Sequence, residues 1–230
     1  MIELADVYDD LLQDLDAIES YRKFIKQHLD QGEILELACG TGDLIQCLKS
    51  EYQIEGLDID EKMLNKAREK NPGFKFYHQS MLKLENTLKY DAIILFGDSL
   101  NYLLEETEIK QLFQQVLQHL KPKGLFLFDM HSEQRLIEFK EEYIEEGLIQ
   151  SIPYQWTIMS LEDSMVHHHF AFYSKDSQFD EKTVIQRVYP CAMIKKLLNE
   201  NGYEFEVYSD FNYQVRLDCE KYFFVARRGK

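Results

Sequence analysis

Short apolar runs alternate with amphipathic stretches along most of the chain. A continuous apolar run bounded by turn residues is typical of a buried strand, whereas apolar residues three and four positions apart indicate a helix with one face on a core. Because the two patterns alternate, we expect an α/β fold with a doubly wound, mostly parallel sheet. The expected strands are 33–38, 53–60, 74–78, 90–97, 125–128, 204–211 and 221–227.

Helical spacing connects these strands. Between residues 105 and 120, for example, Ile109, Leu112 and Val116 fall on one face. Residues 3–30 show the same kind of spacing before the first strand. The other expected helices are 43–50, 61–70, 132–140 and 191–201.

The alternation of strands and helices stops between residues 141 and 189, where acidic residues interrupt the pattern. Within this stretch we expect strands at 155–162, 165–174 and 183–189. Because only short turns separate them, antiparallel pairing is favoured, and we expect a small antiparallel β lid over the crevice of the main sheet. The chain is then one domain, 1–230, with an N-terminal helical cap (1–30), a core (31–140 and 190–230) and the inserted lid (141–189).

A glycine turn follows the first strand. Gly40 and Gly42 come directly after the apolar run, and a helix is expected to begin at once. Glycines at this point let the backbone reverse and bring its N–H groups close to a ligand. The dinucleotide fingerprint would need a third glycine where Ile45 stands, which argues against an NAD-dependent dehydrogenase. Glu36 lies inside the strand, and its carboxylate would repel a pyrophosphate but suit a cofactor that carries positive charge.

The pattern Glu36-x-x-x-Gly40-x-Gly42 resembles the first motif of the class I S-adenosylmethionine-dependent methyltransferases. The sequence Asp-Ser-Leu-Asn-Tyr-Leu at 98–103 is similar to a bacterial branch of that family that acts on small molecules. The resemblance implies a Rossmann-like sheet whose last strand is antiparallel. It also implies S-adenosyl-L-methionine as the cofactor and in-line methyl transfer to a nitrogen or oxygen nucleophile of a small-molecule substrate. An ordinary nucleotide-binding turn, or a glycine loop without a ligand, is the alternative.

Residues at the ends of several strands are expected around this cofactor. Asp58 follows the glycine turn by about twenty residues, the spacing at which an acid bonds ribose hydroxyls. Its alternative role, capping helix 61–70, suits Asp60 better. Ser80 stands where the family usually has an acid near the adenine, so that contact is expected to be less specific. The full expected set of cofactor residues is Tyr21, Glu36, Ala38, Gly40, Gly42, Asp58, Ile59, Met63, Ser80, Met81 and Phe96.

The nucleophile must also lose a proton. Asp98, Tyr8, His131 and the histidines of the lid carry groups that can accept it, and the sequence does not choose among them. Asp98 has an alternative role as a helix cap, and Tyr8 as a core residue with a wet hydroxyl.

The run His167–His169 invites a metal-site hypothesis. On a strand, His167 and His169 share one face, and His168 lies on the other. No Cys or carboxylate at ligand spacing completes a set, so we expect no metal site. We assign His167 and His169, together with Tyr102, to the substrate side instead.

The charge balance bears on the substrate class. The net charge of −15 arises from 41 acidic and 26 basic residues. An acidic surface repels phosphate backbones, so nucleic acid is disfavoured as a partner. An RNA or protein methyltransferase, or a non-catalytic methyltransferase-like subunit that holds cofactor for a partner, are the alternative functions. The sequence leaves a homodimer open.

The N-terminus and the cysteines indicate the cellular compartment. The first residues are acidic and lack the basic region of a signal peptide. No apolar run is long enough to span a membrane. Cys39, Cys47, Cys191 and Cys219 show no C-x-x-C pairing, which favours reduced thiols in a cytoplasmic protein.

Overall fold

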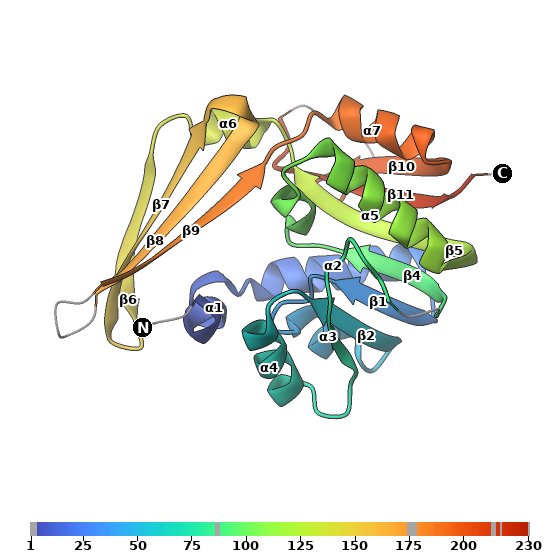
Figure 1. Ribbon diagram of the computed structural model, residues 1–230, viewed down its shortest axis with the longest axis horizontal. Coiled ribbons are helices and arrows are strands. Elements are labelled where there is room, and N and C mark those ends of the chain that lie inside the picture. Colours follow the sequence, from blue (N-terminus) through green and yellow to red (C-terminus); the bar gives the residue numbers. More distant parts are fainter. Residues whose placement is uncertain (1–3, 86–87, 174–178, 213–214, 217, 230) are drawn as a thin grey trace.

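The computed structural model describes residues 4–85, 88–173, 179–212, 215–216 and 218–229. The expected first helical residue, 3, and the expected last residue of one lid strand, 174, lie outside the described residues. Two sheets organise the fold, one with seven strands and one with four. The smaller sheet stands to one side of the larger one (Figure 1).

The larger sheet is mostly parallel. Its strands are β1 (Glu33–Leu37), β2 (Gln53–Asp58), β3 (Phe76–His78), β4 (Tyr90–Leu95), β5 (Leu120–His131), β10 (Tyr203–Ser209) and β11 (Lys221–Arg228). Their order in space is β10-β11-β5-β4-β1-β2-β3. The pairs from β3 to β5 are parallel, whereas β11 is antiparallel to both β5 and β10. The expected doubly wound, Rossmann-like sheet with an antiparallel last strand is therefore confirmed.

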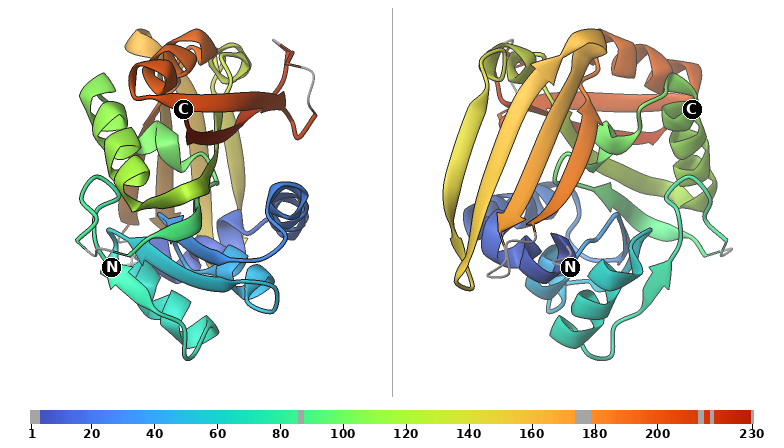
Figure 2. Two further views of the ribbon diagram at one scale, coloured as in Figure 1. Left: turned by 90° about the vertical axis from the view of Figure 1, so that its right-hand side faces the viewer. Right: turned by 60° about the vertical axis from the view of Figure 1, so that its left-hand side comes forward.

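Helices cover both faces of this sheet because its central strands are apolar at consecutive positions. Ile34 belongs to one hydrophobic cluster and its neighbour Leu35 to the other, since successive residues of a strand point to opposite faces. The helices on the Leu35 side are α5 (Glu106–His119) and α7 (Cys191–Glu200). Those on the Ile34 side are α2 (Leu15–His28), α3 (Asp43–Leu48) and α4 (Glu61–Lys70) (Figure 2). No helix in the described ranges is both long and apolar enough to cross a membrane.

The smaller sheet is wholly antiparallel. Its strands lie in sequence order and are β6 (Tyr143–Ile149), β7 (Ile152–Leu161), β8 (Met165–Tyr173) and β9 (Phe179–Arg187). The sequence did not indicate β6, whose residues are mostly exposed at the sheet edge. Helix α1 (Leu4–Leu12) packs on this sheet, where Val7 shares a hydrophobic cluster with Phe170 and Phe172.

Two element boundaries illustrate where the sequence pattern was right and wrong. Asp60 caps α4 as expected, since its carboxylate accepts hydrogen bonds from the N–H groups of Lys62 and Met63. In contrast, β5 begins at Leu120 and not at residue 125, because Leu120 already pairs with Tyr90 before a register shift. The expected helix over 132–140 is the shorter α6 (Gln134–Glu138).

Candidate active site

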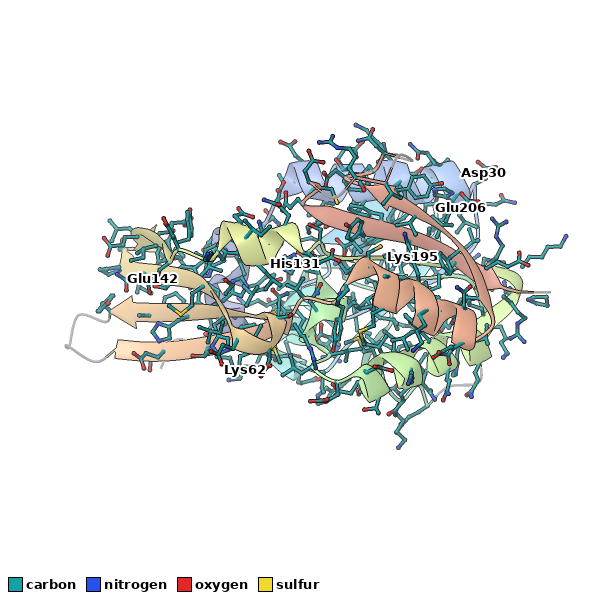
Figure 3. The ribbon with its side chains drawn as sticks, turned by 90° about the horizontal axis from the view of Figure 1, so that it is seen from above. Asp30, Lys62, His131, Glu142, Lys195 and Glu206 are labelled. Atoms are coloured by element: carbon teal, nitrogen blue, oxygen red, sulfur yellow. The ribbon has the colours of Figure 1, made fainter. Side chains whose placement is uncertain are left out.

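The carboxyl ends of the parallel strands open into a cavity of about 350 Å³. Its walls come from α1 and α2, from the glycine turn after β1, from the segment after β4, and from the ends of β5 and β11. The smaller sheet closes the remaining side with Trp156, His168, Phe170, Val184 and Gln186. In Figure 3, His131 of β5 lies where the two sheets approach each other.

The glycine turn has left-handed backbone at three positions. The φ angles are 51° at Ala38, 52° at Gly40 and 78° at Gly42. A Cβ on Gly42 would come within 2.9 Å of Asn71 Nδ2 and 3.1 Å of Ala67 Cβ, so this glycine allows close packing on α4. A Cβ on Gly40 would meet nothing within 4 Å, because Gly40 lies at the cavity wall. Gly42 therefore allows close packing on α4, whereas Gly40 leaves space at the cavity wall.

Glu36 presents an incompletely bonded carboxylate to the cavity. The residue is buried, lines the cavity, and its Oε2 has no hydrogen-bond partner among the described residues. Burial, followed by the charges of Asp58 and Asp43, raises its pKa well above the ordinary value. A ligand with a hydrogen-bond donor would give Oε2 a partner, and a positive charge on the ligand would offset the cost of burying the ionised carboxylate. The site therefore fits a cofactor that carries an amino group and a positive charge.

Asp58 stands at the end of β2 beside the glycine turn. Its Oδ2 accepts from the Gly40 N–H at 2.8 Å, and its Oδ1 accepts from the Asp60 N–H at 2.9 Å. Burial raises its pKa, which these backbone hydrogen bonds oppose. A carboxylate can accept more hydrogen bonds than these, so Asp58 can also bind a ligand hydroxyl.

We expect Asp58→Ala to weaken cofactor binding by about 1–3 kcal/mol, the range for hydrogen bonds to a charged group. The change also leaves the N–H groups of Gly40 and Asp60 without their acceptor, which would weaken every ligand of the turn alike. Calorimetry with the cofactor and with an analogue that lacks ribose hydroxyls separates the two effects. Equal losses for both compounds would show that Asp58 does not bind the ribose.

The other expected cofactor residues fall into two groups. Tyr21, Ala38 and Phe96 line the cavity, and the rings of Tyr21 and Phe96 stack with centroids 4.8 Å apart. The second group is not part of the cavity lining as described and follows β2 and β3; Ile59 in it is 72% exposed. This group consists of Ile59, Met63, Ser80 and Met81. Their cofactor contacts stay predictions.

Helix α1 is fastened to the glycine turn by charged groups. Asp9 accepts from the Thr41 hydroxyl at 2.6 Å and pairs with Lys70 of α4 at 2.5 Å. Lys70 also lies 2.7 Å from Asp43. These contacts hold the neighbouring Tyr8 at the cavity, where burial and then the charge of Asp58 raise the pKa of its hydroxyl to about 12.

A charged cluster of Asp98, Lys221 and Asp129 lies beside Tyr21. Lys221 Nζ is 2.7 Å from Asp98 Oδ2 and 3.4 Å from Asp129 Oδ2. Asp129 is fully buried and accepts from the Tyr21 hydroxyl at 3.0 Å and from the Asp98 N–H at 3.0 Å. Sequence reasoning missed both Lys221 and Asp129. No local signal marks them, because their partners come from strands distant in the sequence.

Burial has opposite outcomes for the two carboxyls of this cluster. For Asp98, burial favours a raised pKa, but Lys221 and His131 outweigh it and hold the pKa below its ordinary value. For Asp129, burial raises the pKa to about 6 although Lys221 opposes it. Asp98 does not cap the following turn with its side chain and has a left-handed φ of 60°. Such strain in a non-glycine residue is often found at functional sites.

His131 lies next to this cluster. Its Nδ1 is 3.2 Å from Asp98 Oδ1, and its Nε2 is 3.1 Å from Gln186 Oε1. Burial lowers the pKa of His131, so the imidazole is neutral near pH 7. Asp98, Tyr8 and His131 therefore meet at one cavity, as their candidate roles require.

The placement of the lid histidines differs from expectation. His168 lines the cavity, whereas His167 and His169 project from the opposite face of β8, where His169 lies 3.5 Å from Glu181. The assignment of His167 and His169 to the substrate side thus differs from their placement, because both faces of this strand carry histidines and apolar residues and the pattern does not show which face meets the cavity. Tyr102 does line the cavity and is 46% exposed. Across the part of the chain that is described, no three His, Cys, Asp or Glu side chains group to hold a metal ion.

A glycine turn, an acid at the end of the second strand and an unpartnered carboxylate together define a nucleoside-cofactor site with a place for a cation. The model of a family described as "Methyltransferase domain" matches residues 34–124. A protein of Geobacillus sp. (strain WCH70), provisionally named a methyltransferase, is 33% identical over 239 residues, covering 96% of each chain. The protein YqeM of Bacillus subtilis (strain 168), named in the same way, is 30% identical and covers 98% of this chain and 96% of its own.

Solved structures agree with these relatives. The crystal structure of a S-adenosylmethionine-dependent methyltransferase from Clostridium acetobutylicum ATCC 824 superposes with a TM-score of 0.81 at 23% identity, covering 99% of this chain and 98% of that one. The chain belongs to the class I S-adenosylmethionine-dependent methyltransferases. It is an enzyme of that family, and its cofactor is S-adenosyl-L-methionine.

Proposed function

We propose that this methyltransferase acts on a nitrogen or oxygen nucleophile of a small molecule. The observation that carries the proposal is the cavity of about 350 Å³ at the strand ends, whose size is typical of small-molecule sites. The smaller sheet supplies an aromatic wall, in which Trp156 stacks on Phe170 with centroids 5.3 Å apart.

Relatives with small substrates support the same class. A sequence relative from Streptomyces fradiae, covering 55% of this chain at 24% identity, is named a dTDP-3-amino-3,6-dideoxy-alpha-D-glucopyranose N,N-dimethyltransferase. A structure of the sugar N-methyltransferase KedS8 from Streptoalloteichus sp. ATCC 53650 superposes with a TM-score of 0.81 at 17% identity, which bears on the fold. Amino sugars are therefore the first substrates to try.

The residues assigned by sequence have the following proposed roles. Glu36 and the glycine turn hold the methionine side of the cofactor, and Asp58 holds the ribose. Ile59, Met63, Ser80 and Met81 lie along the adenine. The cofactor supplies an electrophilic methyl group, and the chain aligns the nucleophile with it and excludes water.

The three candidate proton acceptors differ in their protonation states. Tyr8, with a pKa raised to about 12, keeps its proton near pH 7. Asp98 is ionised but is a weak base, since its pKa is held low by Lys221 and His131 against the effect of burial. His131 is neutral and has a lone pair to offer, because burial lowers its pKa. This favours His131, assisted by Asp98.

We propose that residues 1–30 form a cap, 31–140 and 190–230 the catalytic core, and 141–189 a lid that shapes the substrate side. Trp156, His168 and Gln186 of the lid line the cavity, which supports this division. An RNA or protein methyltransferase and a non-catalytic partner subunit are the alternatives. A homodimer and a cytoplasmic location stay predictions.

The substrate class can be tested by incubating the protein with labelled S-adenosyl-L-methionine and separate pools of amino sugars, small amines, phenols, bulk tRNA and denatured protein. We expect methyl label in a small-molecule pool. Trp156→Ala should remove that turnover while S-adenosyl-L-methionine still binds, because Trp156 lies on the lid wall. Label found in the tRNA or protein pool would contradict the proposal. Cofactor binding without label in any pool would favour the non-catalytic subunit.

A further inference from the structure

Gln186 joins the lid to the core at the candidate proton acceptor. The residue lies on β9, is 4% exposed, and lines the cavity. Its Nε2 donates to the backbone carbonyl of Asp98 at 3.3 Å. Its Oε1 is 3.1 Å from Nε2 of His131 and also 3.1 Å from Nε2 of His168. One side-chain amide thus contacts both of the histidines that face the cavity.

These contacts fix where the histidine protons are. A backbone carbonyl can only accept a hydrogen bond, so the amide nitrogen of Gln186 must face Asp98 and the amide oxygen must face the histidines. That oxygen can only accept, so His131 and His168 must each carry a proton on Nε2. In the neutral ring of His131, Nδ1 then holds the lone pair.

The geometry leaves two acceptors facing each other. His131 Nδ1 and Asp98 Oδ1 are 3.2 Å apart, are both buried, and have no hydrogen-bond partner among the described residues. The two atoms are not in hydrogen-bond geometry, so Nδ1 keeps a free lone pair beside the negative charge of Asp98. That charge favours uptake of one proton by His131 once the ring turns toward it.

We propose that Gln186 is a positioning residue of the methyl transfer, which keeps His131 in the Nε2–H tautomer so that Nδ1, beside the carboxylate of Asp98, accepts the proton of the nucleophile. The proposal rests on the function proposed above. The nucleophile forms its new bond to the methyl carbon with its lone pair, and the electrons of the broken C–S bond stay on sulfur. The N–H or O–H proton of the nucleophile moves to His131 Nδ1, where the negative charge of Asp98 stabilises it.

The surroundings suit a proton that arrives and leaves. The charged and titratable groups around His131 come from the segment after β4, from β11, from α6 and from β8, and are Asp98, Lys221, Arg135 and His168. Burial, Lys221 and Arg135 lower the pKa of His131, while Asp98 and the hydrogen bond with Gln186 raise it. Burial lowers the pKa of His168 to about 4, so His168 does not compete for the proton near pH 7.

Ring-¹⁵N spectra of histidine-labelled protein without cofactor test the tautomers directly, with signals assigned by His131→Asn and His168→Asn. The wild type should show both rings protonated at Nε2 near pH 7. Gln186→Met removes the acceptor at similar volume, and His131 should then carry its proton on Nδ1 and donate it to Asp98. Gln186→Glu keeps an acceptor, so the Nε2–H form should remain and the pKa of His131 should rise. Gln155→Met, on the same sheet and outside the cavity lining, should change neither ring.

Kinetics test the link to catalysis. With a substrate from the pools above, Gln186→Met should lower kcat by roughly 10²-fold, the lower end for general acid–base catalysis, with KM little changed. Gln186→Glu should restore most of kcat and move the pH profile to higher pH. An Nδ1–H signal for His131 in the wild type, or unchanged kcat in Gln186→Met, would overturn the proposal. Absence of any substrate would count against the proposed function, while the spectra would still decide the role of Gln186.

Discussion

Lys221→Met is expected to destabilise the folded protein by about 3 kcal/mol, the lower end of the ~3–5 kcal/mol range for breaking a buried ion pair by removing one partner. The lower end applies because 18% of the Lys221 side chain is exposed. The variant would leave Asp98 and Asp129 as neighbouring buried carboxyls without their cation. Methionine fills similar space, so lost packing contributes little. Urea unfolding followed by circular dichroism measures the change.

The pH dependence of this loss has a definite sign. With Lys221 in place, the pKa of Asp129 is about 6. Removing the lysine removes the charge that opposes burial, so the pKa values of both Asp129 and Asp98 should rise. A carboxyl whose folded-state pKa lies above its unfolded value favours folding when protonated and loses that contribution as the pH rises through the folded pKa. The deficit of Lys221→Met relative to wild type should therefore be largest above about pH 7 and shrink toward about pH 5.

A surface lysine provides the control. Lys75 pairs with Glu55 at 2.8 Å, but its side chain is 69% exposed. Lys75→Met should leave stability almost unchanged at every pH, because exposed ion pairs contribute little. A deficit for Lys221→Met that does not vary with pH would mean that lost packing, and not the two carboxyls, causes it.

The cluster around Lys221 also bears on catalysis. Two carboxylates next to a cationic methyl donor would stabilise its charge, which disappears during methyl transfer, and would thereby raise the barrier. Lys221 lies between Asp98 and Asp129 and cancels part of that field. The lysine would thus allow Asp98 to stay beside His131 as an ionised partner without holding the reactant state too tightly.

The sequence predicted features that are local and missed those that depend on distant segments. The glycine turn, the Asp60 cap and the apolar strands each depend on residues close together in the sequence, so they can be predicted from the sequence pattern. Lys221 is different, because its partners reside on β5 and after β4, and one lysine at the start of a strand resembles a surface residue. Gln186 was missed for the same reason.

The lid was harder to predict than the core. Strand β6 has glutamates at its exposed edge, and this hides the alternation that marks a strand. The sequence predicted correctly which residues of β8 share a face. Alternation within a strand does not show which face meets the cavity, because that depends on how the sheet packs. His168 was thereby overlooked in favour of His167 and His169. The orientation of an inserted sheet is set by its packing on α1, through residues such as Val7.

Gly40→Val is expected to remove binding of S-adenosyl-L-methionine, by at least ~100-fold or about 2.7 kcal/mol. The backbone of Gly40 lies at the cavity wall with a φ of +52°, and a Cβ there would point into space that no protein atom fills within 4 Å. In the loaded enzyme a branched side chain would occupy that space against the cofactor. The left-handed backbone adds strain of about 1–3 kcal/mol in the folded state.

Gly202→Val separates exclusion of the cofactor from strain. Gly202 follows α7, has a φ of +78°, and likewise has nothing within 4 Å of an added Cβ, but it is not part of the cavity lining. Both variants should therefore lose similar stability in urea, whereas calorimetry should show lost cofactor binding in Gly40→Val alone. Normal binding by Gly40→Val would mean that the turn does not contact the cofactor. Loss of binding in both variants would assign the effect to weakened folding. Loss of binding in Gly40→Val alone would establish that Gly40 leaves space for the ligand. Gly42, two residues further along, has a different role, because it allows packing against Ala67 and Asn71 of the neighbouring helix and turn.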